Sequence, residues 1–387
     1  MNRRKLLIIV TAILLSICSI SSMRFYYFEE ASSVSSYSLL IFTMIATWAI
    51  IVRQVPLKNN SILMAAVVFA FYTLFVEINE IVGESMINRV HIILSIFAIP
   101  TGLAIGELLG INNGSRAKSI NGSFILMIIP LVISIVFYYL MPIKVPDSIF
   151  IVLLLFPLVF FLKKKYLDLL FFFIVGLLCL LSAKRSVIVV YGLISIFYVV
   201  FYYLVETRRI ASQKVFSMLL MLTFILAVFF TIQNNAAIMS RVVDRFNDIE
   251  ETGGSGRKDM YGRLLAHYQS SSFGDKIFGH GYDAVKEQVL GISAHNDLLE
   301  VLYDYGLISA LLYVYLLVRI ILLAIRLIRS RMTMRFELLM TWVVLAFLLV
   351  LSMLNCIITS SIYVFVIYLE LGLVIAQLKN KNSKVII

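Results

Sequence analysis

Residues 253–306 form the longest polar stretch of the chain. Their sequence is GGSGRKDMYGRLLAHYQSSSFGDKIFGHGYDAVKEQVLGISAHNDLLEVLYDYG. It interrupts a chain that otherwise alternates apolar runs with short connectors, and it holds three of the four histidines. With flanking residues from Gln233 onward, the connection is long enough to fold as a small lobe, and loops longer than about 15 residues are usually functional. We expect this lobe to carry the chemistry.

The composition decides the class of protein. Apolar residues make up 61% of the chain, charged residues 14%, and the mean hydropathy is +0.98, which excludes a water-soluble globular protein. The net charge of +11 would suit nucleic acid, but the basic residues lie in short connectors between apolar runs, where membrane proteins keep them for orientation. We therefore expect no nucleic-acid partner. The three cysteines lie in apolar runs without a CxxC pair, so they predict no metal site.

Long apolar runs divide the rest of the chain into transmembrane helices. A crossing needs about 20 apolar residues, which predicts about twelve spans and leaves roughly eleven to thirteen open. The runs are residues 5–22, 37–53, 61–78, 90–109, 123–142, 148–162, 166–182, 186–205, 214–232, 306–326, 337–355 and 358–378. We expect an all-α polytopic membrane protein. Its parts are nine spans in residues 1–232, a large catalytic loop at 233–305, and three spans with a tail in residues 306–387.

The distribution of basic residues predicts the orientation. With a cytoplasmic N-terminus, most of the 33 Lys and Arg residues fall on the cytoplasmic side, as the positive-inside rule requires. The short outer loops then hold only Arg24, Arg89, Lys144, Lys184 and Arg185. We therefore expect both termini in the cytoplasm and the loop 233–305 outside the cell.

Lys184 and Arg185 are unusual because they occupy a tight outer turn between two very apolar runs. One interpretation is a pair whose charged ends reach the lipid headgroups while their stems stay in the apolar layer. The other is an anion site at the outer surface, where the Arg185 guanidinium binds a phosphate through two hydrogen bonds. Ser182 and Ser186 flank the pair and would supply spare hydroxyl donors.

A helix along the membrane surface is predicted directly after the flexible TGGSG segment. Its apolar residues recur at helical spacing and are Met260, Tyr261, Leu264, Leu265 and Tyr268. Arg257 lies near its start and Arg263 two turns further on. A charge on such a helix usually belongs to its solvated face, but an arginine presented to the outer leaflet also suits a pyrophosphate.

The glycine-rich sequence FGHGY at 278–282 separates this helix from the next one. Glycines mark turns far more often than phosphate-binding loops. We therefore expect this turn to have a geometric role, and His280 to be a turn residue rather than a catalyst.

His295 precedes Asn296 and Asp297, either of which is a good helix N-cap. The helix that follows would present an apolar face and stop at Gly306; the face is Leu298, Leu299, Leu302 and Tyr305. At a helix start the helix dipole disfavours imidazolium, and a neutral imidazole is what a general base needs near pH 7. The alternative is a histidine that only caps or packs, which is the interpretation we favour for His267.

These residues together resemble the O-antigen polymerase and O-antigen ligase family of bacterial surface-polysaccharide assembly, which includes the Wzy-type polymerases. The resemblance rests on Arg257 with Tyr261 four residues on, Gly279-His280-Gly281, His295-Asn296, and Leu298, Leu302 and Tyr305-Gly306-Leu307 leading into a span. The sequence SAKRS at 182–186 resembles the arginine-bearing turn found upstream in the same family.

The resemblance implies a membrane-embedded, GT-C-like glycosyltransferase of the bacterial inner membrane. Donor and acceptor glycans would be linked through pyrophosphate to undecaprenol. Arg185 and Arg257 would bind the donor pyrophosphate, with Lys184 and Arg263 beside them, and His295 would deprotonate the acceptor hydroxyl. Tyr261 and Asn296 would support these groups. Fixed guanidinium charge can stabilise a departing diphosphate, so the reaction would need no metal or other cofactor and would invert the anomeric carbon.

Three alternatives remain open at this point. A polymerase, which we favour, joins one lipid-linked repeat unit to another in O-antigen or capsule synthesis, with a flippase and a chain-length regulator as candidate partners. A ligase moves the glycan to another acceptor, such as the core of a lipopolysaccharide. A transporter or flippase would show related halves and more charges within spans. The alternative to a metal-free site is a weak magnesium set formed by Asp248, Glu250 and Glu251.

The predicted topology can be tested at position 288, in the middle of the loop. A cysteine placed there is expected to react with an impermeant thiol reagent in intact cells or spheroplasts, because the loop would face outward. Labelling that requires lysis would reverse the orientation of the whole chain.

Overall fold

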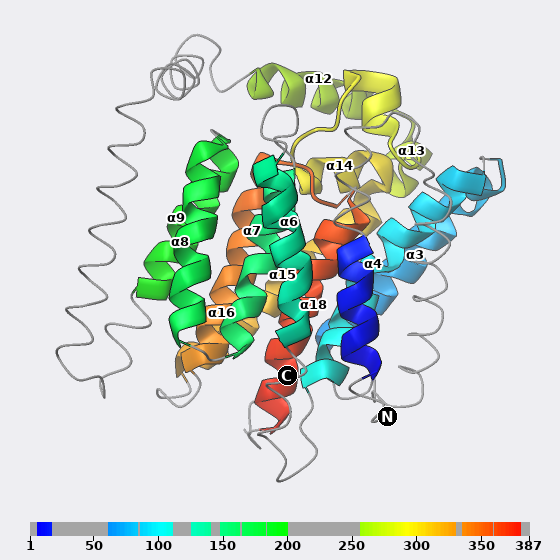
Figure 1. Ribbon diagram of the computed structural model, residues 1–387. Helices are drawn as coiled ribbons and strands as arrows, with labels where there is room; N and C mark the ends of the chain where they lie inside the picture. Colours follow the sequence, from blue (N-terminus) through cyan, green and yellow to red (C-terminus); the bar gives the residue numbers. More distant parts are fainter. Residues whose placement is uncertain are drawn as a thin grey trace, which may run out of the picture.

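The computed structural model describes residues 6–17, 61–83, 86–110, 125–140, 148–162, 165–182, 184–199, 256–329, 335–358 and 360–380. Within these ranges every regular element is a helix (Figure 1). Long helices form a bundle, and shorter ones, α12 to α14, lie across one of its ends. The expectation of an all-α polytopic membrane protein is therefore confirmed at this level.

The helices follow the apolar runs closely. They are a first helix at residues 6–17, α3 (Ser61–Gly83), α4 (Met86–Gly110), η2 (Ile125–Ile128), α6 (Ile129–Leu140), α7 (Ser148–Leu155), η3 (Phe156–Leu162), α8 (Lys165–Leu181), α9 (Arg185–Val199), α12 (Arg257–Ser270), α13 (Phe273–Phe278), η5 (Val285–Leu290), α14 (Asp297–Asp304), α15 (Gly306–Arg329), α16 (Arg335–Ala346), η6 (Phe347–Leu351), α17 (Ser352–Leu354) and α18 (Ser361–Asn380). The predicted spans 37–53 and 214–232 lie outside the described residues. Among the described helices, five are long and apolar enough to cross a membrane, so the count of about twelve stays a prediction.

Helices α4 and α18 make the closest packing in the described bundle. Gly102, Gly106 and Gly110 recur every fourth residue and form a glycine stripe along α4. A Cβ atom at Gly106 would lie 2.1 Å from the backbone oxygen of Leu369, and one at Gly372 would lie 2.2 Å from a backbone oxygen of α4. Small residues let membrane helices approach until their backbones touch, so these glycines set the distance between the two helices.

The two helices run in parallel, since Gly102 faces Phe365 near the start of α18 and Gly110 faces Ala376 near its end. At that end Lys379 pairs with Glu107, with 2.7 Å between Nζ and Oε2. Figure 1 shows α18 starting at the end that carries α12 and α14 and finishing at the opposite one.

Basic residues gather at the end of the bundle away from the lobe. Helix α15 begins at Gly306, directly after α14, and finishes with Arg326 and Arg329 in its last turn. At 1.5 Å per residue, such a helix carries the chain across the apolar layer. The lobe and these arginines thus lie at opposite ends of α15. The predicted orientation also places them on opposite sides of the membrane.

The surface helix is present at residues 257–270, but its buried face differs from the predicted one. Met260 and Leu264 are buried, whereas Leu265 is 42% exposed. The predicted stripe was therefore too broad, because a helix with contacts on only one side buries a narrower face than the sequence pattern indicates.

The glycine stripe predicts that two glycine-to-alanine substitutions will differ sharply in their effect on stability. Gly106→Ala would drive a methyl group into the α18 backbone, and such overpacking costs about 1–3 kcal/mol. Gly192 on α9 has nothing within 4 Å of an added Cβ, so Gly192→Ala is expected to leave stability unchanged or slightly raised. Thermal unfolding in detergent measures both. Equal melting temperatures for the two variants would contradict the close packing of α4 on α18.

Candidate functional site

His295 lies immediately before α14, as predicted. Asn296 is the N-cap, and its side-chain oxygen accepts hydrogen bonds from the amides of Leu298 and Leu299 at 3.0 and 3.2 Å. His295 itself has a left-handed backbone, with φ of 52°. This conformation is costly for a residue with a side chain and persists only where the surroundings impose it. The half-buried imidazole is thus held at the N-terminal end of the helix.

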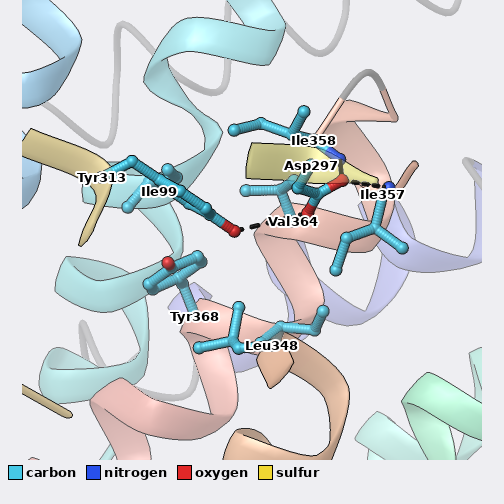
Figure 2. A pocket seen from close by; sticks show the side chains of 9 residues that line it. Ile99, Asp297, Tyr313, Leu348, Ile357, Ile358, Val364 and Tyr368 are labelled. Carbon is cyan, nitrogen blue, oxygen red and sulfur yellow. Dashed lines mark hydrogen bonds between the residues drawn. The ribbon is translucent and has the colours of Figure 1, made fainter. Parts of the chain in front are cut away.

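Asp297, the first residue of α14, anchors this helix to the bundle. Its carboxylate is fully buried, and Oδ1 accepts from the amides of Ile357 and Ile358 at 2.7 and 3.1 Å. Oδ2 accepts from the Tyr313 hydroxyl at 3.3 Å. Figure 2 shows the Asp297 side chain between these partners. The surrounding gap has no room for a water molecule, so these bonds alone satisfy the two amides.

Those amides belong to a break between two helices. Helix α17 ends at Leu354 and α18 begins at Ser361, and we call the described residues between them, 354–358 and 360, the α17–α18 break. Arg257, at the start of α12, donates from Nη2 to the Leu354 carbonyl at 2.7 Å. A free carbonyl at a helix end is a natural acceptor for a guanidinium. The break therefore holds both Arg257 and the helix that follows His295.

Helix α14 also buries three acids, on the side roughly opposite the predicted apolar face. Asp297, Glu300 and Asp304 are buried, while Leu298 and Leu302 are only half-buried. Leu298 and Leu302 still pack against the core and Tyr305 is buried in it, so the predicted apolar face is present. The sequence analysis missed the three carboxylates, which take backbone amides as partners. Their spacing of three and four residues was visible in the sequence, and it places them on one face.

Two of these carboxylates bind loops of the lobe. Glu300 Oε2 accepts from the amide of Ala294 at 2.6 Å, next to His295, and Asp304 Oδ1 accepts from the amide of Val285 at 3.0 Å. Burial raises the pKa of Glu300 to about 7. Burial, and next the charge of Glu300, raise the pKa of Asp304 well above its ordinary value. Buried acids with shifted pKa values are frequent at functional sites.

The FGHGY turn has the geometric role that was predicted for it. His280 donates from Nδ1 to the Tyr303 carbonyl at 3.1 Å, and its Nε2 lies 2.8 Å from the Ser271 hydroxyl. Its ring stacks on that of Tyr303. Gly279 and Gly306 both have left-handed backbones and touch each other, since a Cβ at Gly306 would lie 2.6 Å from the Gly279 nitrogen. The turn closes the corner where the lobe enters α15.

The remaining predicted residues of the lobe lie on α12. Tyr261 is half-buried and Arg263 is exposed. The exposed His267 contacts the Tyr303 hydroxyl through Nδ1 at 3.0 Å, which agrees with a packing role. The acids of the alternative magnesium set, Asp248, Glu250 and Glu251, lie outside the described residues.

Lys184 is linked by two ring contacts to the region that follows the α17–α18 break. Arg185 begins α9, and the Lys184 ammonium lies 4.6 Å from the centroid of the Phe150 ring. That ring lies 6.1 Å from the ring of Tyr363, which follows the α17–α18 break. The Ser182 hydroxyl donates to the Cys179 carbonyl at 2.6 Å, so it is not the spare donor that was predicted.

Residues 169–314 match the family model described as O-antigen ligase. This part of the chain is similar to the O-antigen ligase family. The matched part runs from α8 to the first half of α15 and contains every residue that we predicted for the site. No curated protein and no solved structure matches the chain. Helices α4 and α18 and the α17–α18 break lie outside the matched residues.

Asp297 predicts how stability depends on pH. Burial, the largest cause, raises its pKa from 3.8 to about 7. Between these values the folded protein holds the proton and the unfolded chain does not, so stability falls as pH rises from about 4 to about 7. Asp297→Asn keeps an oxygen for both amides and removes the titration. As pH rises from about 4 to about 7, the melting temperature of Asp297→Asn in detergent is expected to fall less steeply than that of the wild type.

Asp259→Asn is the matched control, because Asp259 is exposed on α12. Its melting temperature is expected to follow the wild-type slope. An Asp297→Asn slope as steep as that of the wild type would show that Asp297 does not titrate in this range.

Proposed function

We propose that the chain is a polymerase that joins lipid-linked oligosaccharide repeat units at the outer face of the bacterial cytoplasmic membrane, in O-antigen or capsule synthesis. The observation that carries the proposal is the pair of attachments to the α17–α18 break: Arg257 through Leu354 and the helix after His295 through Asp297. Both belong to the matched family domain. A cation and a base held on one rigid segment suit a reaction in which a charged group leaves as a proton is removed.

The donor would be a glycan on undecaprenyl pyrophosphate. Arg257 and Arg185, with Lys184 and Arg263 nearby, would bind its diphosphate. Guanidinium groups match phosphate oxygens in pairs and keep their charge at any physiological pH. As the bond between the anomeric carbon and the phosphate oxygen breaks, negative charge grows on the diphosphate, and fixed cations stabilise it most at that moment.

The acceptor hydroxyl would attack the anomeric carbon from the side opposite the leaving group. His295 would take the proton from this hydroxyl as the general base, since it lies at the N-terminal end of α14. The products would be a lengthened glycan with an inverted linkage and free undecaprenyl pyrophosphate. Tyr261 and Asn296 would support Arg257 and the N-terminus of α14.

A ligase is the second candidate, because the matched family is described as O-antigen ligase. It would use the same donor chemistry and differ only in the acceptor. A transporter receives less support, because the structure ties a polar lobe to the bundle through buried hydrogen bonds. A transport pathway instead needs helices that separate and close again.

Purified protein given a synthetic undecaprenyl-pyrophosphate repeat unit is expected to make a ladder of longer glycans, in the presence of EDTA as well. His295→Ala should lower the rate by about a hundredfold or more, the usual contribution of a general base. The matched control is His267→Ala, which removes an exposed histidine of the same lobe and should leave the ladder intact. Normal ladders from His295→Ala would remove the base assignment, and transfer only to a foreign acceptor would indicate a ligase.

A further inference from the structure

Helix α13 exposes two phenylalanines outside the membrane-spanning segments. Phe273 is 82% exposed and Phe278 is 49% exposed. Full burial of a phenylalanine side chain stabilises a protein by about 1.5–3 kcal/mol, so leaving two of them open on one short helix is costly. Exposed apolar groups that lie together usually mark an interaction surface.

The backbone holds these rings outward. Ser272 caps α13 by accepting from the Asp275 amide at 3.1 Å, and the Gly279 amide closes the helix on the Asp275 carbonyl at 2.7 Å. The Tyr268 hydroxyl and the Lys276 ammonium then tie α12 and α13 together, at 3.0 and 2.7 Å. Phe273 is therefore exposed on a helix whose ends and position are fixed by hydrogen bonds.

This surface continues into a membrane-spanning helix. Phe278 is next to Gly279, which packs against Gly306 at the start of α15. Leu307 and Leu311 on the first turns of α15 are 39% and 59% exposed. The exposed side of α15 then runs on with helical spacing through Val314, Tyr315, Val318, Leu322, Ile325 and Ile328. Such a stripe on a span is the side that faces lipid.

We propose that α13 rests in the interfacial layer of the bilayer, on the leaflet next to the lobe, with Phe273 and Phe278 in contact with lipid. The occupant is a bilayer because the α13 surface is continuous with the lipid-facing stripe of α15. Amphipathic segments that expose aromatic residues bind there, buried to roughly 5–10 Å. The contact fixes the height of the lobe above the headgroups, and it does not depend on which reaction the lobe catalyses.

Fluorescence quenching in proteoliposomes tests this contact. Phe273→Cys is labelled with nitrobenzoxadiazole before reconstitution, and Gln269→Cys on the exposed side of α12 is the matched control. Lipids with a spin label high on the acyl chain are expected to quench position 273 at least about twice as strongly as position 269, as interfacial burial implies. Iodide in the water should show the reverse preference. Wild-type protein carried through the same labelling gives the background from native cysteines.

Two results would overturn the proposal. Equal iodide quenching at both positions, without lipid quenching at 273, would place α13 in water. Protection of position 273 from both quenchers would mean that protein, such as a partner or a second copy, covers the surface instead of lipid.

Discussion

The carboxylate of Asp297 is the contact on which the geometry of the lobe depends. It accepts from two backbone amides of the α17–α18 break and from the Tyr313 hydroxyl, in a gap with no room for a water molecule. A buried amide without an acceptor costs about 1–3 kcal/mol, so the break and α14 stabilise each other. Arg257 adds a further bond to the same break through Leu354. Three separate parts of the chain thus meet in one rigid junction.

The bundle beneath this junction is built to keep it in place. Helix α18 leaves the break and packs along the glycine stripe of α4, where the backbones touch. A second attachment joins the lobe to α3, since Glu77 accepts from the Tyr282 amide at 3.2 Å. If α13 also rests on the bilayer, the lobe is held from below by helices and at its side by lipid. Rigid support of this kind favours catalysis, because misplacement by about 1 Å can cost a hundredfold in rate.

Much of this arrangement could be predicted from local sequence signals. The apolar runs predicted the helices, because a bilayer requires long apolar segments. Asn296 predicted the start of α14, and the glycines at 279 and 281 predicted the turn. These features depend on residues close together in the chain, which is why a single sequence reveals them.

The contacts between distant segments could not be predicted in this way. In the sequence Asp297 is a candidate capping residue, yet the backbone amides that it binds lie 60 and 61 residues away. The partner of Arg257 is 97 residues away. The acids of α14 and the glycine stripe of α4 were visible as patterns, but what they touch depends on the fold.

A double-mutant cycle on glycan synthesis measures the junction directly. If the α17–α18 break couples Arg257 to α14, Arg257→Lys and Asp297→Asn should act together, and their combined effect on turnover should depart from the product of the single effects by at least about threefold, as for residues that share partners. Arg263→Lys, on the exposed side of α12, should combine with Asp297→Asn as a simple product. Independent effects of Arg257→Lys and Asp297→Asn would contradict the coupling through the break.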